Sequence, residues 1–161
     1  MLGRDDAPMI ARSEPDRVAD ELAIRNLLAQ LVWHADNTTI DDIDDYVACF
    51  TVDAEWEMRG DVRRGHDQIR QGGIDRRKAG TMGPGSKIAH FLSVTLVTFD
   101  DADTASAKSY IQAYRDAHTN PTITVMGQYH DVFRRTDRGW KLHRRRVEDD
   151  DTCASETYEP I

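Results

Sequence analysis

The stretch Ile88-Ala-His-Phe-Leu-Ser-Val-Thr-Leu-Val-Thr-Phe99 is rich in β-branched and aromatic residues and predicts a long strand. Side chains of a strand alternate between its two faces, so every second residue shares a face. One face would carry four aliphatic side chains and one imidazole: Ile88, His90, Leu92, Val94 and Leu96. We therefore expect the imidazole of His90 to point into an apolar surface.

Other strands are predicted on both sides of this segment. Turn residues separate three later runs, at residues 104–115, at residues 122–135 and from Trp140 onward. A short hairpin precedes them. Its first strand carries Ala54, Trp56 and Met58 on one face, and its second strand ends at Gly65.

Two helices are predicted before these strands. In the first, Ile24, Leu28, Val32 and Asp36 follow a helical period, so the carboxylate of Asp36 continues a buried stripe. The sequence Ser13-Glu14-Pro15-Asp16 is typical of a helix start. A second cap pattern, Thr39 with Asp42, precedes the apolar stripe of a second helix: Ile40, Ile43, Val47 and Phe50.

A third helix is predicted over residues 67–78, and three glycines and one proline predict a loop over residues 79–87. This order of helices and strands is typical of the α+β class. We expect a cone-shaped, curved antiparallel sheet wrapped around an N-terminal helical hairpin and the third helix. The folded domain would span residues 13–148, between a flexible arm at residues 1–12 and an acidic tail at residues 149–161.

Composition restricts the possible partners. The chain has 161 residues, 31% of them charged, and a net charge of -8, which argues against nucleic acid and anionic membrane surfaces. Two cysteines, Cys49 and Cys153, are too few for a disulfide framework and favour a reducing cytoplasm. The first residues lack the apolar stretch of a signal peptide, and no run is long enough to span a membrane.

Asp36 and His90 are the candidate catalytic pair. Removal of a proton from carbon needs a base whose pKa is near neutrality, held within hydrogen-bond reach. A carboxylate on one ring nitrogen fixes the tautomer of an imidazole and offsets the loss of basicity on burial. His90 would be the base and Asp36 would orient it. The alternative is a structural hydrogen bond that ties the helix to the sheet.

Several segments resemble the SnoaL-like proteins of the nuclear-transport-factor-2-like superfamily. The match covers residues 16–148 and is carried by these segments: Leu28–Asp36, Asp45–Phe50, Asp53–Trp56, His90, Ala107–Tyr110, Gly127–Tyr129 and Arg135–Trp140. Within the superfamily, the nearest enzymes in motif are scytalone dehydratase, bile-acid 7α-dehydratase and hexachlorocyclohexane dehydrochlorinase. The resemblance implies the cone fold and chemistry without a cofactor. Asp36 and His90 match the Asp and His of these enzymes, and Arg145 or a neighbour matches a late arginine. Where scytalone dehydratase has tyrosines near the first helix, this chain has Leu31, Val32 and Trp33.

This resemblance predicts a cofactor-independent lyase or isomerase, with dehydration of a small hydrophobic, cyclic molecule as the first choice. A polyketide-type aldol cyclase is the alternative within the same chemistry. A non-catalytic module, like the small subunit of ring-hydroxylating dioxygenases, is the alternative without chemistry. The histidine and cysteine spacings predict no metal site, and no glycine-rich loop predicts a nucleotide cofactor.

Six large side chains are candidates to line the substrate cavity, although such spacing more often indicates core packing than ligand contact: Trp33, Trp56, Met58, Leu92, Met126 and Tyr129. Periodicity leaves open whether Arg144, Arg145 or Arg146 faces the cavity. The outer face of the sheet is expected to be apolar and to form a homodimer or homotrimer, through Phe91, Val97, Phe99 and Ile111.

Overall fold

The computed structural model describes residues 14–149. Its three helices are α1 (Glu14–Asn37), α2 (Ile43–Val47) and α3 (Gly65–Lys78). Its six strands are β1 (Phe50–Met58), β2 (Asp61–Arg64), β3 (Ile88–Phe99), β4 (Thr104–Arg115), β5 (Thr122–Thr136) and β6 (Gly139–Asp149). The expected cap at Ser13, the arm and the tail after Asp149 lie outside the described residues.

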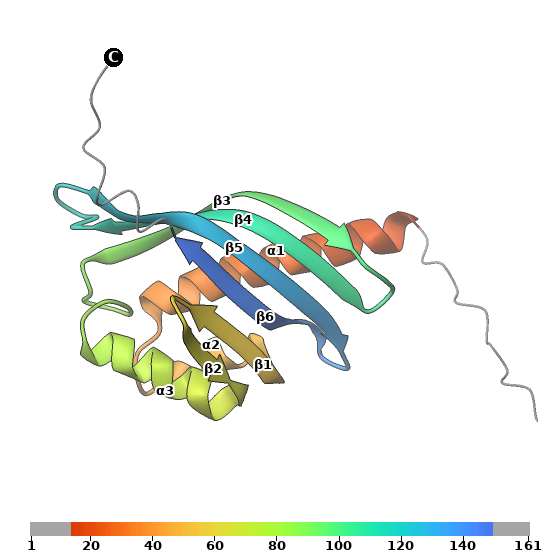
Figure 1. The fold of residues 1–161 in the computed structure, drawn as a ribbon, viewed down its shortest axis with the longest axis horizontal. Helices are drawn as coiled ribbons and strands as arrows, with labels where there is room; N and C mark the ends of the chain where they lie inside the picture. Colours follow the sequence, from red (N-terminus) through yellow and green to blue (C-terminus); the bar gives the residue numbers. More distant parts are fainter. Residues whose placement is uncertain (1–13, 150–161) are drawn as a thin grey trace, which may run out of the picture.

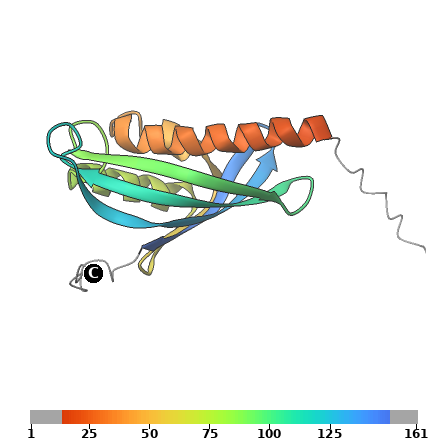
Figure 2. The ribbon, with the colours of Figure 1, turned by 90° about the horizontal axis from the view of Figure 1, so that it is seen from above.

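The strands form one sheet in the order β2-β1-β6-β5-β4-β3 (Figure 1). The sheet curves, and α1 lies along one of its faces (Figure 2). The α+β class and the curved sheet are therefore confirmed. One feature differs from the expected antiparallel sheet, because β1 pairs with β6 in parallel. Parallel neighbours need a long crossover, and here the chain from β2 through α3 and the β3–β5 meander supplies it.

The second helix is shorter than the sequence predicts. The hydroxyl of Thr39 donates to the Asp42 carboxylate at 2.8 Å and accepts the Asp42 amide at 3.2 Å, so the cap pattern is present. The helix nevertheless ends at Val47, and Phe50 begins β1. Phe50 lies beside Leu142 of β6, whose amide donates to Cys49 O at 2.9 Å. Phe50, which the apolar stripe placed in the helix, is therefore in a strand because it pairs with β6.

Helix α1 is fixed to the sheet by an apolar stripe and a polar anchor. The most deeply buried residues of the stripe are Ile24, Leu28 and Leu31. Full burial of one such side chain contributes about 2 kcal/mol. Nearer the start of the helix, the buried Asp20 carboxylate accepts the Trp140 indole N–H at 3.2 Å and pairs with Arg135. These contacts place the last turn of α1, and therefore Asp36, against the start of β3.

A β-bulge at Val94 changes which side chains of β3 face the core. Ser93 pairs with Tyr110 and Thr95 with Ser109, so Val94 has no partner residue on β4. Its φ is 45° and its side chain is 78% exposed. One extra residue reverses the alternation of the strand beyond it. The expected inward run is correct as far as Leu92, while Leu96 is exposed.

The same bulge corrects the expected outer face. Val97 and Phe99, predicted to point outward, pack against the core. Ile111, also predicted outward, lies opposite Leu92 on β4 and is buried. Phe91 is exposed as expected. The large exposed side chains that share its face, judged from the strand register, are Leu96, Tyr110, Ile123 and Met126.

Candidate active site

Asp36 and His90 are in direct contact between the end of α1 and the edge strand β3. One oxygen of the Asp36 carboxylate lies 2.5 Å from His90 Nδ1, and the other accepts the His90 backbone N–H at 2.8 Å. β3 forms one edge of the sheet, so this N–H faces away from β4 and needs a partner outside the sheet. A carboxylate can only accept hydrogen bonds, so Nδ1 carries a hydrogen, and in the neutral imidazole the lone pair is therefore on Nε2.

Arg77 of α3 supports the turn that carries Asp36. Its guanidinium donates to the backbone carbonyls of His34 at 2.8 Å and Thr38 at 2.7 Å. Burial lowers the pKa of Arg77, and electrostatic interactions with Tyr46 and Asp36 act in the opposite direction. A cation at the C-terminus of a helix is also favoured by the helix dipole. Arg77 therefore acts as a positioning residue for the end of α1.

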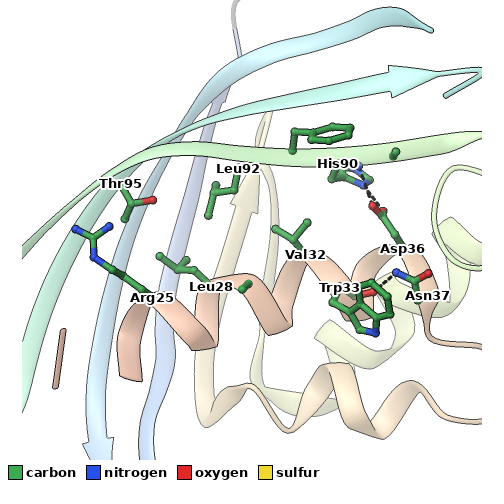
Figure 3. Close-up of a pocket in the computed structure, with 12 residues that line it drawn as sticks. Arg25, Leu28, Val32, Trp33, Asp36, Asn37, His90, Leu92 and Thr95 are labelled. Atoms are coloured by element: carbon green, nitrogen blue, oxygen red, sulfur yellow. Dashed lines mark hydrogen bonds and ion pairs between the residues drawn. The ribbon is translucent and has the colours of Figure 1, made fainter. Parts of the chain in front are cut away.

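His90 lies between two hollows. A groove of about 500 Å³ runs between α1 and β3, and Figure 3 shows Leu28 and Val32 facing Leu92 and Thr95 across it. Asp36 and His90 point toward one another at one end of this groove. An interior cavity of about 380 Å³ lies between the helices and the sheet, and His90 also lines this cavity. Both volumes are typical of sites for small molecules.

The interior cavity is largely apolar, with polar groups at a few places. Its apolar wall comes from α1, the segment after α3 and five strands, and includes Leu31, Val32, Ala35, Trp56, Met58, Met82, Ile88, Ile111, Ala113, Val125 and Val147. Its polar groups, besides His90, include Tyr46, Tyr129, Thr81, Thr124 and four arginines. Thr81 and Met82 belong to the predicted loop 79–87, which the structure contains. The loop thus closes part of the cavity.

Arg145 is the arginine of the late triplet that faces the cavity. It is 4% exposed, and its Nε and Nη2 donate to the two oxygens of the buried Asp131 carboxylate at 2.8 and 2.7 Å. Its Cζ lies 3.9 Å from the centre of the Tyr129 ring. Burial acts to lower the pKa of Arg145, but the charge and hydrogen bonds of Asp131 outweigh it and raise the pKa. The guanidinium is permanently charged.

A bulge at His143 decides this orientation. Leu142 pairs with Phe133 and Arg144 with Val132, which leaves His143 as the extra residue of β6. Trp140 and Leu142 are buried, so regular alternation would place Arg144 on the same face, but after the bulge Arg145 is the buried residue. Arg144 and Arg146 lie over the opposite face of the sheet, next to Glu55 and Glu57 of β1.

Tyr46 and Tyr129 add two phenol groups to the cavity. Burial raises the pKa of Tyr46, and it raises the pKa of Tyr129 to about 12, although the charge of Arg145 acts against both shifts. Both phenols are therefore neutral hydrogen-bond donors at physiological pH. Tyr46 was not among the residues expected at the site. Its signal was present, since Tyr46 follows Ile43 at helical spacing and continues its apolar stripe.

The other expected cavity residues divide into three groups. Trp56, Met58 and Tyr129 line the interior cavity, and Leu92 and the largely exposed Trp33 line the groove. The expectation for Met126 is wrong. It is 47% exposed, lines neither space and lies opposite Gln112 on the outer face. Thr124 is the extra residue of a bulge in β5, because Val125 pairs with Ala113 of β4 and Ile123 pairs with Tyr114.

Within residues 14–149, no group of three or more histidine, cysteine, aspartate or glutamate side chains is arranged to hold a metal ion. In the same part of the chain, none of the helices has the length and the apolar character needed to cross a membrane.

Solved structures with this fold come from proteins of different descriptions. A protein of Novosphingobium aromaticivorans classed provisionally as an aromatic ring hydroxylase is 28% identical, with a TM-score of 0.66 over 83% of this chain and 90% of the other. A second protein of that organism, classed provisionally as a scytalone dehydratase, is 21% identical, with a TM-score of 0.69 over 85% and 88%. The type 2 hexachlorocyclohexane dehydrochlorinase LinA is 16% identical, with a TM-score of 0.64 over 86% and 90%.

The similarities to the dehydratase and to LinA show a shared fold. No curated protein matches the chain significantly. The model of the SnoaL-like domain family matches residues 16–146, which include all three helices except the first two residues of α1 and nearly all of the sheet. The chain therefore belongs to the SnoaL-like domain family.

Proposed function

We propose that this protein is a cofactor-independent lyase or isomerase that acts on a small hydrophobic, cyclic molecule, with dehydration as its reaction. The observation that carries the proposal is the Asp36–His90 contact at the wall of the interior cavity. A histidine whose Nδ1 is held by a carboxylate presents the lone pair of Nε2 as a base. The similarity to dehydratase and dehydrochlorinase structures agrees with this chemistry.

In the proposed reaction, His90 Nε2 takes the proton from a carbon next to a carbonyl group. The electron pair of that C–H bond forms the carbon–carbon double bond, and the hydroxyl group on the neighbouring carbon leaves. The His90 imidazolium returns the proton to the hydroxyl oxygen as it departs, so that water is the second product and Nε2 regains its lone pair. The Asp36 carboxylate stabilises the imidazolium that forms on His90.

Charge on oxygen develops at the carbonyl and at the leaving group. General acid–base catalysis contributes about 100- to 10,000-fold, so donors that stabilise this charge must supply the rest. The neutral phenols of Tyr46 and Tyr129 and the guanidinium of Arg145 are three of the donors in the cavity wall and are assigned this role. Arg145 is fixed by Asp131, which makes it a preorganised donor.

The experiment measures proton removal, which precedes any choice of leaving group. The protein is incubated in D₂O with a panel of cyclic β-hydroxyketones, and deuterium incorporation and water loss are followed by NMR. Wild-type protein should catalyse exchange at the carbon next to the carbonyl, and His90→Ala should not. Equal exchange by His90→Ala and wild-type protein would exclude the proposed base.

There are two alternatives to a dehydratase: a cyclase that uses the same catalytic site, and a non-catalytic subunit. An aldol cyclase would use the same dyad to form a carbon–carbon bond, and the same NMR experiment would show ring closure in place of water loss. A non-catalytic small subunit is supported by the 28% identity with the protein provisionally classed as an aromatic ring hydroxylase. Such a subunit would co-purify with a larger chain, whereas the proposed enzyme purifies alone.

The proposal includes a homodimer or homotrimer formed through the outer face of the sheet. We define the outer apolar patch as Phe91, Leu96, Tyr110, Ile123 and Met126, all at least partly solvent-exposed large side chains. Phe91 and Met126 both lie beside Gln112 in neighbouring strands, so the patch is continuous across β3, β4 and β5. Exposed apolar patches of this kind usually mark interfaces.

A further inference from the structure

The wall of the interior cavity contains arginine side chains but no carboxylate side chain. Arg59, Arg76, Arg115 and Arg145 line it, and none of the lining residues in the described chain is an aspartate or a glutamate. Charges act more strongly in a water-poor space than in bulk water. A surplus of one sign in such a space selects the charge of the ligand.

Two of these four arginines have carboxylate partners. Arg145 is paired with the buried Asp131, as described above. Arg59 Nε donates to the Asp149 carboxylate at 2.6 Å. Their charges are therefore largely balanced within the protein, and the surplus comes from the other two.

Arg76 and Arg115 provide the unbalanced charge. Among residues 14–149, no carboxylate forms an ion pair with either guanidinium. The neighbouring Arg77 has a structural role, because it donates hydrogen bonds to the backbone carbonyls of His34, Thr38 and Gly73. Arg76 makes no such set of bonds within the described part of the chain.

The Arg76 guanidinium is nevertheless held in place. Its Cζ lies 4.0 Å from the centre of the Trp56 ring, which forms part of the cavity wall. Stacking on an aromatic face leaves the N–H groups at the edge of the guanidinium free to bind a planar anion with two parallel hydrogen bonds. The charge of Arg76 also reaches the cavity phenols, because it acts against the burial that raises the pKa of Tyr46 and Tyr129.

We infer that the ligand of the interior cavity is an apolar carboxylic acid, bound as its anion with the carboxylate on Arg76 and assisted by Arg115. The inference rests on the proposed function for the reaction at His90 and adds the substrate class. The cavity, at about 380 Å³, holds one small molecule, and His90 lines the same space. The carboxylate serves as a handle, while the apolar body lies against residues such as Met58 and Ile111.

The test uses two probes of one shape that differ in charge, 2-naphthoate and 2-naphthamide. Their affinities for the full-length protein are measured by isothermal titration calorimetry at pH 7.5. Wild-type protein should bind naphthoate about tenfold more tightly than naphthamide, because a charge-assisted bond is worth at least this factor. Arg76→Gln should weaken naphthoate binding about tenfold and leave naphthamide binding within twofold. Arg115→Gln should act in the same direction by a smaller factor.

Two controls locate the effect. Arg138→Gln removes one positive charge from the exposed turn between β5 and β6, at the opposite end of β5 from the cavity residues Thr124 and Val125, and should leave both affinities unchanged (Figure 1). Ala113→Phe fills the interior cavity and should weaken the binding of both probes. Thermal unfolding of each variant is measured on the same samples. If a variant does not fold, the ratio of the naphthoate and naphthamide affinities of wild-type protein still tests the inference.

The inference would be overturned by equal affinity of wild-type protein for the two probes, by absence of naphthoate binding at millimolar concentration, or by equal effects of Arg76→Gln and Arg138→Gln. Naphthoate binding that survives Ala113→Phe would place the anion outside the cavity and would also overturn it. None of these measurements involves turnover. Probe binding needs no reaction at His90, so a failure of the proposed base in the deuterium-exchange experiment and a failure of the anion site in calorimetry are distinguishable.

Discussion

Both oxygens of the Asp36 carboxylate accept hydrogen bonds from one residue, His90: the backbone N–H at 2.8 Å and ring Nδ1 at 2.5 Å. A single side chain thus orients the imidazole and satisfies the edge of the sheet. The two tasks can be separated by substitution, because the amide of asparagine can still accept the backbone N–H but carries no charge.

Asp36→Asn should therefore reduce turnover about 100-fold or more and leave the fold intact. The substitution keeps the volume and one acceptor but removes the charge that holds the tautomer and stabilises the imidazolium. Turnover and thermal unfolding are measured on the same samples, with Asp41→Asn, which removes the same charge at an exposed position, as the control. A rate near that of the wild type would make the contact a structural tie.

His90→Ala should abolish turnover at a moderate cost in stability, of about 1–2 kcal/mol, from one lost hydrogen bond and a partly exposed cavity. The side chain is 18% exposed, which limits the loss of packing. The measurements are turnover and urea unfolding. A large loss of stability with binding and activity in proportion to the folded fraction would contradict a catalytic role.

Arg145→Met should destabilise the protein by about 3–5 kcal/mol, because it leaves the Asp131 carboxylate buried without its partner. The double variant Arg145→Met/Asp131→Leu removes both charges and should recover most of this loss. Urea unfolding measures both. A double variant no more stable than the single one would show that the packing of Arg145 on Tyr129 matters more than the charge balance.

Stability should fall in alkali partly through Cys49. Burial raises the pKa of the Cys49 thiol to about 11, so the thiol of the unfolded chain loses its proton at a lower pH than the thiol of the native protein. The contribution is fully present below the ordinary thiol pKa of about 8.5 and is lost as the pH rises toward 11. Urea unfolding between pH 8 and 11 should show a steeper decline for wild-type protein than for Cys49→Ala. Parallel curves would contradict this assignment.

The outer apolar patch should hold copies of the chain together. Light scattering at micromolar concentration should show a dimer or trimer, and Phe91→Glu/Met126→Glu should dissociate it, because burying an unpaired carboxylate is costly. Val52→Glu changes an exposed apolar residue of β1 outside the patch and should have no effect. A wild-type protein that is monomeric under these conditions would exclude the interface.

Sequence predicts best the elements whose local pattern is regular and whose ends are marked by turn residues. The ends of β3 and β4 coincide with the prediction because turn residues define them. Asp36 and His90 were found because one ends a regular helical stripe and the other precedes the bulge at Val94. The loop 79–87 followed from its glycines.

The positions that sequence missed depend on contacts between distant segments. The inward orientation of Arg145 accompanies the bulge at His143 and the ion pair with Asp131 on the neighbouring strand, and neither is visible in the local pattern. The outward position of Met126 follows from its register against Gln112. The end of α2 at Val47 reflects the pairing of Phe50 with β6. The local sequence did not predict Arg76 as a cavity residue, because the ring on which it stacks, that of Trp56, belongs to another element.

The bulge at Val94 behaves like a frameshift in a reading frame. Side chains of a strand alternate between two faces, so one inserted residue moves every later side chain to the other face until the strand ends. Loss of Val94 alone would turn Val97 and Phe99 to the solvent and Leu96 to the core, while Ile88, His90 and Leu92 would keep their places. Alignment of this chain with relatives therefore requires a one-residue gap wherever a relative lacks the bulge, since otherwise core positions are compared with surface positions.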